Sequence, residues 1–207
     1  MKIAVVGAGH VGGTLARLWA ACGHDVVVGV RRDGRRGPPS GIDVEGVGEA
    51  CDRADVVALC VPWSAVGDAL AATGPLSGKV VIDATNPLLP DGNGLAVGTN
   101  TSAAEEIAKQ IPDAKVVKAF NSIGAYLLGD ADFGWLRADG YYCGDDAKAK
   151  RIVRGLVEDA GLEPVDTGPL SVARTLEPLA LLWINLLRRQ GTPRDFAFKL
   201  LHREPGS

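Results

Sequence analysis

Three glycines near the start of the chain have the spacing that brings backbone close to a phosphate. Gly7, Gly9 and Gly12 form a G-x-G-x-x-G motif directly after the apolar run "IAVV" and directly before an amphipathic helical pattern. The first glycine allows a tight turn, the second lets backbone approach a pyrophosphate, and the third lets helix and strand pack closely. Free N–H groups at the helix start also attract anions. The motif predicts a dinucleotide site, and a turn without a ligand is the alternative.

The next expected strand, residues 24–30, ends on arginines at the place where an NAD-binding fold usually has an acid. Such an acid would hydrogen-bond the ribose 2′-OH, whereas Arg31 and Arg32 suit a 2′-phosphate because a guanidinium donates parallel, charge-assisted hydrogen bonds. We interpret Asp33 as a turn residue or a partner of a neighbouring arginine, since glycine and "RR" follow it. The pattern favours NADP over NAD, and a solvated basic loop is the alternative.

Residues that follow the other expected strands are further candidates, because parallel strands of such a fold end at one ligand crevice. Three segments occupy these places: Val61-Pro62-Trp63, Thr85-Asn86-Pro87 and Phe120-Asn121-Ser122. Asn86 and Asn121 can hydrogen-bond a carboxamide or a ring carbonyl, with turn chemistry as the alternative, above all for Asn86 before its proline. His10, inside the glycine turn, is expected to have a positional role and not a catalytic one.

Acid–base and metal-binding patterns are not evident in the sequence. Only three histidines are present, with no Ser/His/Asp order, Tyr-x-x-x-Lys pair or isolated pair of carboxylates. The four cysteines lack CxxC and metal-ligand spacing, so we expect reduced thiols, mostly buried: Cys22, Cys51, Cys60 and Cys143. We therefore predict no catalytic side chain and no metal site. If the protein is an enzyme, its reaction rests on the apposition of two bound molecules.

Strand and helix patterns alternate along the chain and would position these residues. Strands are expected at 2–7, 24–30, 55–62, 78–87, 114–120, 140–144 and 162–168. Helices are expected at 10–23, 45–54, 63–72, 101–111 with Thr101 as N-cap, 145–161, 170–190 and 193–202. Loops are expected at 33–43 and 88–100, and the second should border a second substrate. This alternation predicts an α/β, Rossmann-type doubly wound fold with a mainly parallel sheet and additional C-terminal strands and helices.

The whole chain, residues 1–207, is expected to be a single NADP-binding domain with a C-terminal helical extension from about residue 168. The segment "LEPLALLWINLL" at 176–187 is apolar nearly all round, which indicates burial on more than one side. We favour a homodimer interface, with packing inside the monomer as the alternative. The segment is too short to span a bilayer and contains Glu177, Pro178 and Asn185.

The composition is that of a chain that buries a core, with 46% hydrophobic and 23% charged residues. A net charge of −3 gives no reason to expect nucleic acid, and the basic residues at 31–36 suit a small anion better than a polymer. The chain starts at once with a strand and lacks the separate apolar core and cleavage site of a signal peptide. We expect a cytoplasmic protein without a membrane or nucleic-acid partner.

Longer segments resemble the NADPH-dependent oxidoreductases of the deazaflavin coenzyme F-420, a family similar to the NADPH-binding domain of the STEAP metalloreductases. The matching segments run in order from residue 7 to about 170: "GAGHVGGTLA", "GHDVVVGVRR", "VPW", "KAFNSIG", "CGDDAKAKRIV" and "GLEPVDTGPL". The segment "ARTLEPLALLWINL" fits the family's closing helix more loosely. "KAFNSIG" and the two last segments are far more specific than the glycine motif.

The resemblance implies direct hydride transfer between C4 of NADPH and C5 of a deazaflavin stacked on it. In such proteins NADP is held by the turn, the arginines, the loop at Pro62 and the segment from Asn121 to Ala125. Together with the residue-based candidates, this implies a site of Gly7, Ala8, Gly9, His10, Val11, Gly12, Arg31, Arg32, Arg35, Val61, Pro62, Asn86, Asn121 and Ala125.

Three positions depart from the family's pattern. Val30 stands where the family often has serine or threonine, and Asn121 stands where the deazaflavin enzymes can carry histidine. The segment "DATNPLLPDGNG" differs from the family's proline-rich loop. These departures lie near the expected second substrate, so they bear on the acceptor more than on NADP.

Three hypotheses remain open at this point. The first is an oxidoreductase that uses NADP(H) and coenzyme F-420. The second keeps NADPH but passes the hydride to another small-molecule acceptor, such as a flavin, a ferric chelate or a small carbonyl or imine compound. The third is a protein that binds NADP(H) as a sensor without turning it over.

Overall fold

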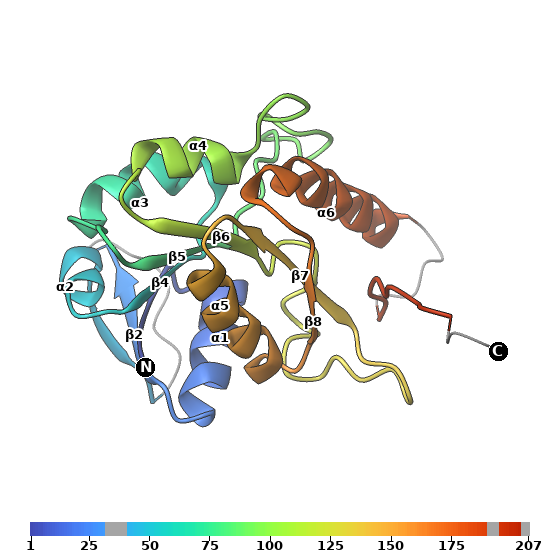
Figure 1. The fold of residues 1–207 in the computed structure, drawn as a ribbon, viewed down its shortest axis with the longest axis horizontal. Helices are drawn as coiled ribbons and strands as arrows, with labels where there is room; N and C mark the ends of the chain where they lie inside the picture. Colours follow the sequence, from blue (N-terminus) through green and yellow to red (C-terminus); the bar gives the residue numbers. More distant parts are fainter. Residues whose placement is uncertain (32–40, 190–194, 204–207) are drawn as a thin grey trace.

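Short apolar, β-branched runs form the strands of one central sheet in the computed structural model, which describes residues 1–31, 41–189 and 195–203 (Figure 1). The strands are β1 (Lys2–Val6), β2 (Asp25–Val30), β3 (Asp43–Gly46), β4 (Val56–Leu59), β5 (Val80–Asp83), β6 (Lys115–Ala119), β7 (Asp139–Gly144) and β8 (Glu163–Asp166). They lie in the order β3-β2-β1-β4-β5-β6-β7-β8, and each neighbouring pair is parallel except β6 with β7. The first six strands have the Rossmann order, so the expected fold class is confirmed.

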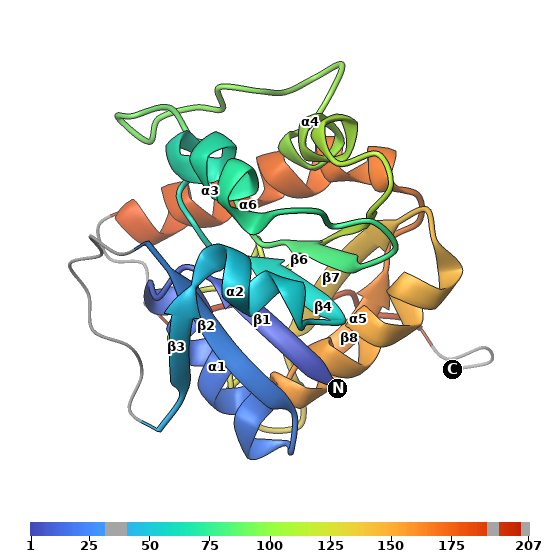
Figure 2. The same cartoon turned by 90° about the vertical axis from the view of Figure 1, so that its left-hand side faces the viewer.

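Helices cover both faces of the sheet, as Figures 1 and 2 show. On one face lie α1 (His10–Ala21) and α5 (Ala147–Asp159). On the other lie α2 (Val47–Asp52), α3 (Val66–Thr73), α4 (Ala103–Gln110) and α6 (Ala173–Arg188). Short 3-10 helices, η1 (Trp63–Ala65) and η2 (Leu170–Val172), directly precede α3 and α6.

The two faces of the sheet bury separate hydrophobic cores because side chains alternate along each strand. In β1, Ile3 and Val5 belong to the core under α1 and α5, whereas Ala4 and Val6 belong to the core under the other helices. Trp19 of α1 is fully buried in the first core, where its indole N–H donates to the Leu156 carbonyl of α5 at 3.0 Å. The indole thereby ties the two helices of this face together.

Several local predictions differ from the structure. Residues 43–46 form β3, because the short run "DVEG" pairs with β2 before α2 begins at Val47. The predicted helix start at residue 45 and the predicted loop end at residue 43 are therefore wrong. The N-cap of α4 is Ser102, whose hydroxyl accepts from the Glu105 N–H at 3.2 Å; Thr101, predicted for this place, instead donates to Glu106.

The helix predicted at 193–202 is absent over residues 195–202, which form neither helix nor strand. This part of the C-terminal segment is held by contacts with the sheet and α6. The ring of Phe196 stacks on Trp183 at 5.4 Å, and Asp139 at the start of β7 accepts from Lys199 Nζ at 2.7 Å and from the Leu200 N–H at 2.5 Å. The irregular backbone of residues 195–202 is therefore held in place by the side chains of Trp183 and Asp139.

The segment Leu170–Arg188, η2 and α6 together, is 19 residues long with a mean hydropathy of 1.3, enough by length and composition to cross a membrane. The prediction from 176–187 alone that this segment is too short is therefore wrong for the full helix. One such helix is weak evidence for a membrane span, because core helices of globular proteins meet the same criteria. Its inner face packs on the second core through Ala173 and Leu176.

Replacing Asp139, the buried carboxylate that holds the C-terminal segment at Lys199 and Leu200, should destabilise the protein. We expect Asp139→Asn, which removes the charge that three donors share, to lower the free energy of unfolding by about 1–3 kcal/mol. Urea unfolding followed by circular dichroism measures the change. Asp130→Asn, at an exposed position, is the matched control and should change stability by less than about 0.5 kcal/mol.

Candidate functional site

The glycine turn lies between β1 and α1, at the point where the strand order reverses between β1 and β4. Gly7 has φ +108°, and a Cβ there would lie 2.6 Å from the Cys60 carbonyl oxygen. A Cβ on Gly12 would overlap the Gly7 carbonyl and approach the Cys60 Cβ to 2.9 Å. A Cβ on Gly9 would meet no protein atom within 4 Å. The first and third glycines are therefore required by the protein's own packing, whereas the open space at the second is suited to a ligand.

One cavity of about 280 Å³ opens beside this turn and reaches the end of β2. Six of the predicted site residues line it: Gly7, Ala8, Gly9, Arg31, Val61 and Pro62. The Arg31 guanidinium lies 4.0 Å from the carboxylate of Asp68 on α3, with both side chains largely exposed. Arg32 and Arg35 lie outside the described residues. The turn and Arg31 thus border the same cavity.

A second cavity, of about 570 Å³, lies on the other side of the start of α1. It contains five more of the predicted residues: His10, Val11, Asn86, Asn121 and Ala125. Its remaining lining includes Tyr126 and three residues of α6, namely Trp183, Ile184 and Leu187. Of the predicted residues, Gly12 lines neither cavity and is buried under the turn. Adjacent residues of one turn, Gly9 and His10, therefore line adjacent cavities.

Asn86 and Asn121 hydrogen-bond each other at the edge of the second cavity. Asn86 Nδ2 donates to the Asn121 carbonyl at 2.9 Å, and Asn121 Nδ2 donates to Asn86 Oδ1 at 3.1 Å and to the Leu176 carbonyl of α6 at 2.9 Å. Flipping the Asn121 amide would point its oxygen at two acceptors, so this orientation is the favoured one. Both amide hydrogens of Asn121 are in use, so its donors are not available to a ring carbonyl of a ligand.

The residue before this pair has unusual backbone geometry. Phe120, directly after β6, has φ +63°, a left-handed conformation that non-glycine residues seldom adopt. Its ring packs edge-on against Trp19 at 5.7 Å, which offsets the local strain. The bend ends β6 and turns the chain toward Asn121.

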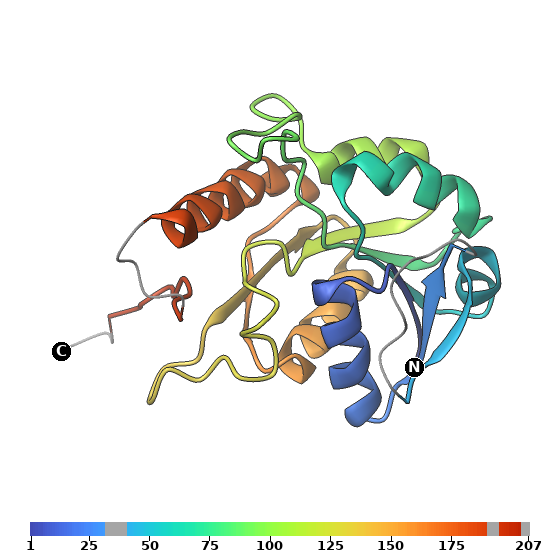
Figure 3. The same cartoon turned by 180° about the vertical axis from the view of Figure 1, so that it is seen from behind.

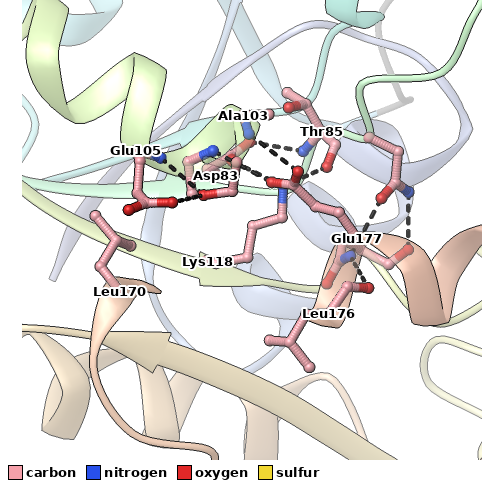
Figure 4. Close-up of polar contacts among 12 residues, drawn as sticks. Asp83, Thr85, Ala103, Glu105, Lys118, Leu170, Leu176 and Glu177 are labelled. Carbon is pink, nitrogen blue, oxygen red and sulfur yellow. Dashed lines mark hydrogen bonds and ion pairs between the residues drawn. The ribbon is translucent and has the colours of Figure 1, made fainter. Parts of the chain in front are cut away.

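A buried charged cluster lies directly behind the asparagine pair, and sequence reasoning missed it. We call it the Lys118 network: Asp83, Thr85, Lys118 and Glu177 (Figure 4). Lys118 Nζ lies 2.8 Å from Asp83 Oδ2 and 3.0 Å from Glu177 Oε1, and it donates to the Thr85 carbonyl at 2.7 Å. All three charged side chains are at most 1% exposed. The available signal was a lysine inside the buried strand "KVVKA" and a glutamate inside an apolar helix.

The first turn of α4 completes the Lys118 network. Glu177 Oε2 accepts from the Ala103 N–H at 3.0 Å, and Glu177 Oε1 accepts from the Ala104 N–H at 3.2 Å. A carboxylate is stabilised at a helix N-terminus, where the N–H groups lack partners and the helix dipole is positive. Burial works to lower the pKa of Lys118, but the carboxylates of Asp83 and Glu177 outweigh it and raise this pKa above its ordinary value. The lysine is therefore a cation that holds two carboxylates.

The 88–100 loop does not border the second cavity in the way the sequence suggested. The lining residue from the connection between β5 and α4 is Asn86, which precedes the loop. The loop instead reaches the last turn of α6, where Arg188 Nη1 donates to the Gly92 carbonyl at 2.8 Å; Figure 3 shows it above this helix. The loop therefore contacts the helix that supplies three residues of the cavity wall.

The cysteines are free thiols, as expected, and one of them lies beside the glycine turn. Burial, with a smaller contribution from Asp83, raises the pKa of Cys60 to about 12, so its thiol stays protonated at neutral pH. By exposed area Cys51 and Cys143 are buried, Cys60 is half-buried and Cys22 is exposed. Within the described ranges, no group of three or more His, Cys, Asp or Glu side chains is placed to hold a metal.

The strand order and the glycine turn define a Rossmann-type dinucleotide-binding protein. Residues 2–87 match a family model described as "NADP oxidoreductase coenzyme F420-dependent". A solved structure from Arthrobacter sp. FB24, provisionally named an F420-dependent NADP-reductase, is 31% identical to the chain, with a TM-score of 0.88 over 98% of this chain and 100% of that one. The chain belongs to the coenzyme F420-dependent NADP oxidoreductase family, a family of NADP-dependent oxidoreductases, and the suspected resemblance is confirmed.

Other relatives are more distant or much longer. Metalloreductase STEAP3 of Rattus norvegicus is 31% identical over 87% of this chain, and Metalloreductase STEAP2 of Homo sapiens is 27% identical over 91%. The chain spans only 37% of the length of either protein. A reductive aminase from Aspergillus terreus, solved with NADPH and ethyl levulinate, is 20% identical with a TM-score of 0.68 over 90% of this chain and 61% of that one, which shows a shared fold alone.

The turn can be tested by comparing alanine at two of its glycines. Gly12→Ala should lower the free energy of unfolding by about 1–3 kcal/mol, because the added methyl group overlaps backbone and Cys60. Gly9→Ala, at φ −71° with open space around it, should change stability by less than about 0.5 kcal/mol and still weaken NADPH binding, because the methyl group enters the ligand's space. Urea unfolding and NADPH fluorescence titration give the two readouts. Equal NADPH affinity of Gly9→Ala and wild type would contradict the assignment.

Proposed function

We propose that the protein transfers a hydride directly between NADPH and a deazaflavin, coenzyme F-420, placed against the nicotinamide. The observation that carries this proposal is that two cavities border consecutive residues, Gly9 and His10, at the start of α1. Gly9 lines the cavity that leads to Arg31, and His10 lines the cavity that leads to Asn121. A dinucleotide lying across the turn would direct its adenosine half to the first cavity and its nicotinamide half to the second. The family membership supports this arrangement.

The residues around the turn suit NADP(H) through donors and charge. The N-terminus of α1 has backbone N–H groups and a positive dipole end for the pyrophosphate, and Gly9 leaves room for its approach. Arg31 borders the adenosine cavity, where a guanidinium can pair with a 2′-phosphate. Asp68 would repel that phosphate, so binding of NADP must draw Arg31 away from Asp68 and toward the ligand.

The second cavity suits a planar acceptor. Tyr126 and Trp183, whose ring centroids are 6.2 Å apart, supply aromatic surface, and Ile123, Ile184 and Leu187 add apolar walls. NADPH supplies the hydride, and reduction of a deazaflavin takes up one further proton. His10 lines the cavity and is exposed, which shows that the cavity is open to solvent on that side. Water can therefore deliver the proton, and a buried acid is not required. Positioning of two molecules is then the main contribution of the protein to the rate.

A second candidate keeps NADPH and changes the acceptor to a flavin or a ferric chelate. It is favoured by the likeness to proteins named metalloreductases, STEAP3 and STEAP2. Asn121, where deazaflavin enzymes can carry histidine, lies in the second cavity and is consistent with a different acceptor. A sensor that binds NADP(H) without turnover is the remaining alternative.

An acceptor panel tests the activity. Purified protein is mixed with NADPH and oxidised coenzyme F-420, and the loss of deazaflavin absorbance is followed; we expect turnover that saturates with both compounds. Parallel assays replace F-420 with FMN, FAD, ferric citrate or a cyclic imine. Turnover only with one of these would favour the second candidate. Tight NADPH binding with no oxidation by any acceptor would favour the sensor.

The cofactor assignment is tested by the double substitution Arg31→Ala and Arg32→Ala. We expect it to weaken NADPH by about tenfold or more and to leave NADH affinity nearly unchanged, because a charge-assisted phosphate contact contributes about 1.5–3 kcal/mol. Fluorescence titration with both cofactors measures the ratio. Asp68→Asn is the control and should strengthen NADPH binding, since it removes the competing carboxylate. Equal weakening of NADPH and NADH would refute the assignment.

A further inference from the structure

The Lys118 network connects α6 to the strand ends on which the second cavity is built. Lys118 belongs to β6, and Asp83 to β5, while Glu177 belongs to α6 and also holds the start of α4 (Figure 4). One ammonium group, carried by β6, thus contacts the neighbouring strand β5 and the helix α6. This helix supplies Trp183, Ile184 and Leu187 to the cavity wall.

The network also touches the cavity's polar edge through one peptide group. Leu176, the neighbour of Glu177, accepts the hydrogen bond that orients the Asn121 amide. Asn121 in turn holds Asn86, so the amides at the cavity edge depend on where the first turns of α6 lie. A displacement of Glu177 would move the Leu176 carbonyl and release one hydrogen of the Asn121 amide.

We infer that Lys118 and Glu177 are positioning residues for the acceptor: they set the place of α6 and, through the Leu176 carbonyl, the orientation of Asn121. This inference rests on the proposed function in taking the second cavity as the acceptor site. Neither side chain touches that cavity, because both are at most 1% exposed and neither lines it. Their action on a ligand is therefore indirect, through Asn121 and the α6 wall.

A second contact between the same helices makes a matched control possible. On the surface, Arg174 of α6 pairs with Glu105 of α4 at 2.6 Å and 2.8 Å. This pair is partly exposed, so its removal should have little effect on the place of α6. Glu105→Gln therefore breaks an ion pair between α4 and α6 without touching the Lys118 network.

The variants Glu177→Asp and Glu177→Gln test the inference. Glu177→Asp keeps the negative charge and shortens the side chain by one methylene group. It therefore tests the inference even if Glu177→Gln fails to fold. In Glu177→Asp we expect the KM for coenzyme F-420 to rise roughly two- to thirtyfold, the range for coupling through a contiguous network, with the NADPH dissociation constant unchanged. Glu105→Gln should leave both values at the wild-type level.

A double-mutant cycle separates positioning from a general loss of stability. If Glu177 acts through Asn121, the effects of Glu177→Asp and Asn121→Ala on the KM for F-420 should be less than multiplicative when combined. A purely structural role predicts independent effects, together with weaker NADPH binding. Multiplicative effects, or a parallel loss of NADPH affinity, would overturn the inference.

Hydrogen–deuterium exchange decides the inference independently of turnover. In the presence of NADPH, Glu177→Asp should speed exchange in residues 120–126 and 173–188 and leave residues 2–30 at the wild-type rate. Unchanged exchange in 120–126 would overturn the inference. A wild-type protein that does not reduce F-420 would refute the proposed acceptor alone, and the exchange experiment would still decide whether Glu177 positions the Asn121 segment.

Discussion

Backbone passes against backbone where the glycine turn meets Cys60, the residue after β4, and both cavities border this turn. Neither Gly7 nor Gly12 has space for a side chain there, so α1 begins close to the end of β4, the neighbour of β1 in the sheet. The start of α1 lies at the switch point of the sheet, with one cavity on each side. A longer separation between helix and strand would merge or displace both cavities. The required absence of two methyl groups thus determines where ligands can lie.

Features that depend on local sequence could be predicted. The strands follow from apolar runs bounded by turn residues, and the glycine turn from the spacing of Gly7, Gly9 and Gly12. Eleven of the fourteen predicted site residues line one of the two cavities: Gly7, Ala8, Gly9, His10, Val11, Arg31, Val61, Pro62, Asn86, Asn121 and Ala125. These residues follow strands, and the carboxyl ends of parallel strands meet at one edge by geometry alone.

Features that depend on long-range contacts could not be predicted. Asp83, Lys118 and Glu177 come from three distant parts of the chain, and only the folded structure brings both carboxylates within 3.0 Å of the Lys118 ammonium. β3 is a short strand whose residues form pairs because β2 offers an edge. The first turn of α4 is likewise held from afar, since the Ala103 N–H donates to Glu177 of α6. In each case a partner far along the chain decides the local structure.

Two carboxylates share one ammonium in the Lys118 network, so the side chains of the network have a formal charge of −1. The helix N-terminus supplies partial positive charge and two N–H donors. Buried ion pairs often contribute little net stability because desolvation opposes the attraction. The network is better understood as a means of specifying one arrangement of α6 among several apolar alternatives.

The contact of Arg188 with Gly92 has a consequence for how the acceptor range of such a protein can change. It ties the last turn of α6 to the 88–100 loop, while Glu177 ties the first turns to the sheet. A helix attached at both ends has little freedom to move outward and admit a larger molecule. Adaptation to a new acceptor should therefore proceed by exchanging single side chains on the inner face of α6, such as Ile184 and Leu187, while its axis stays in place.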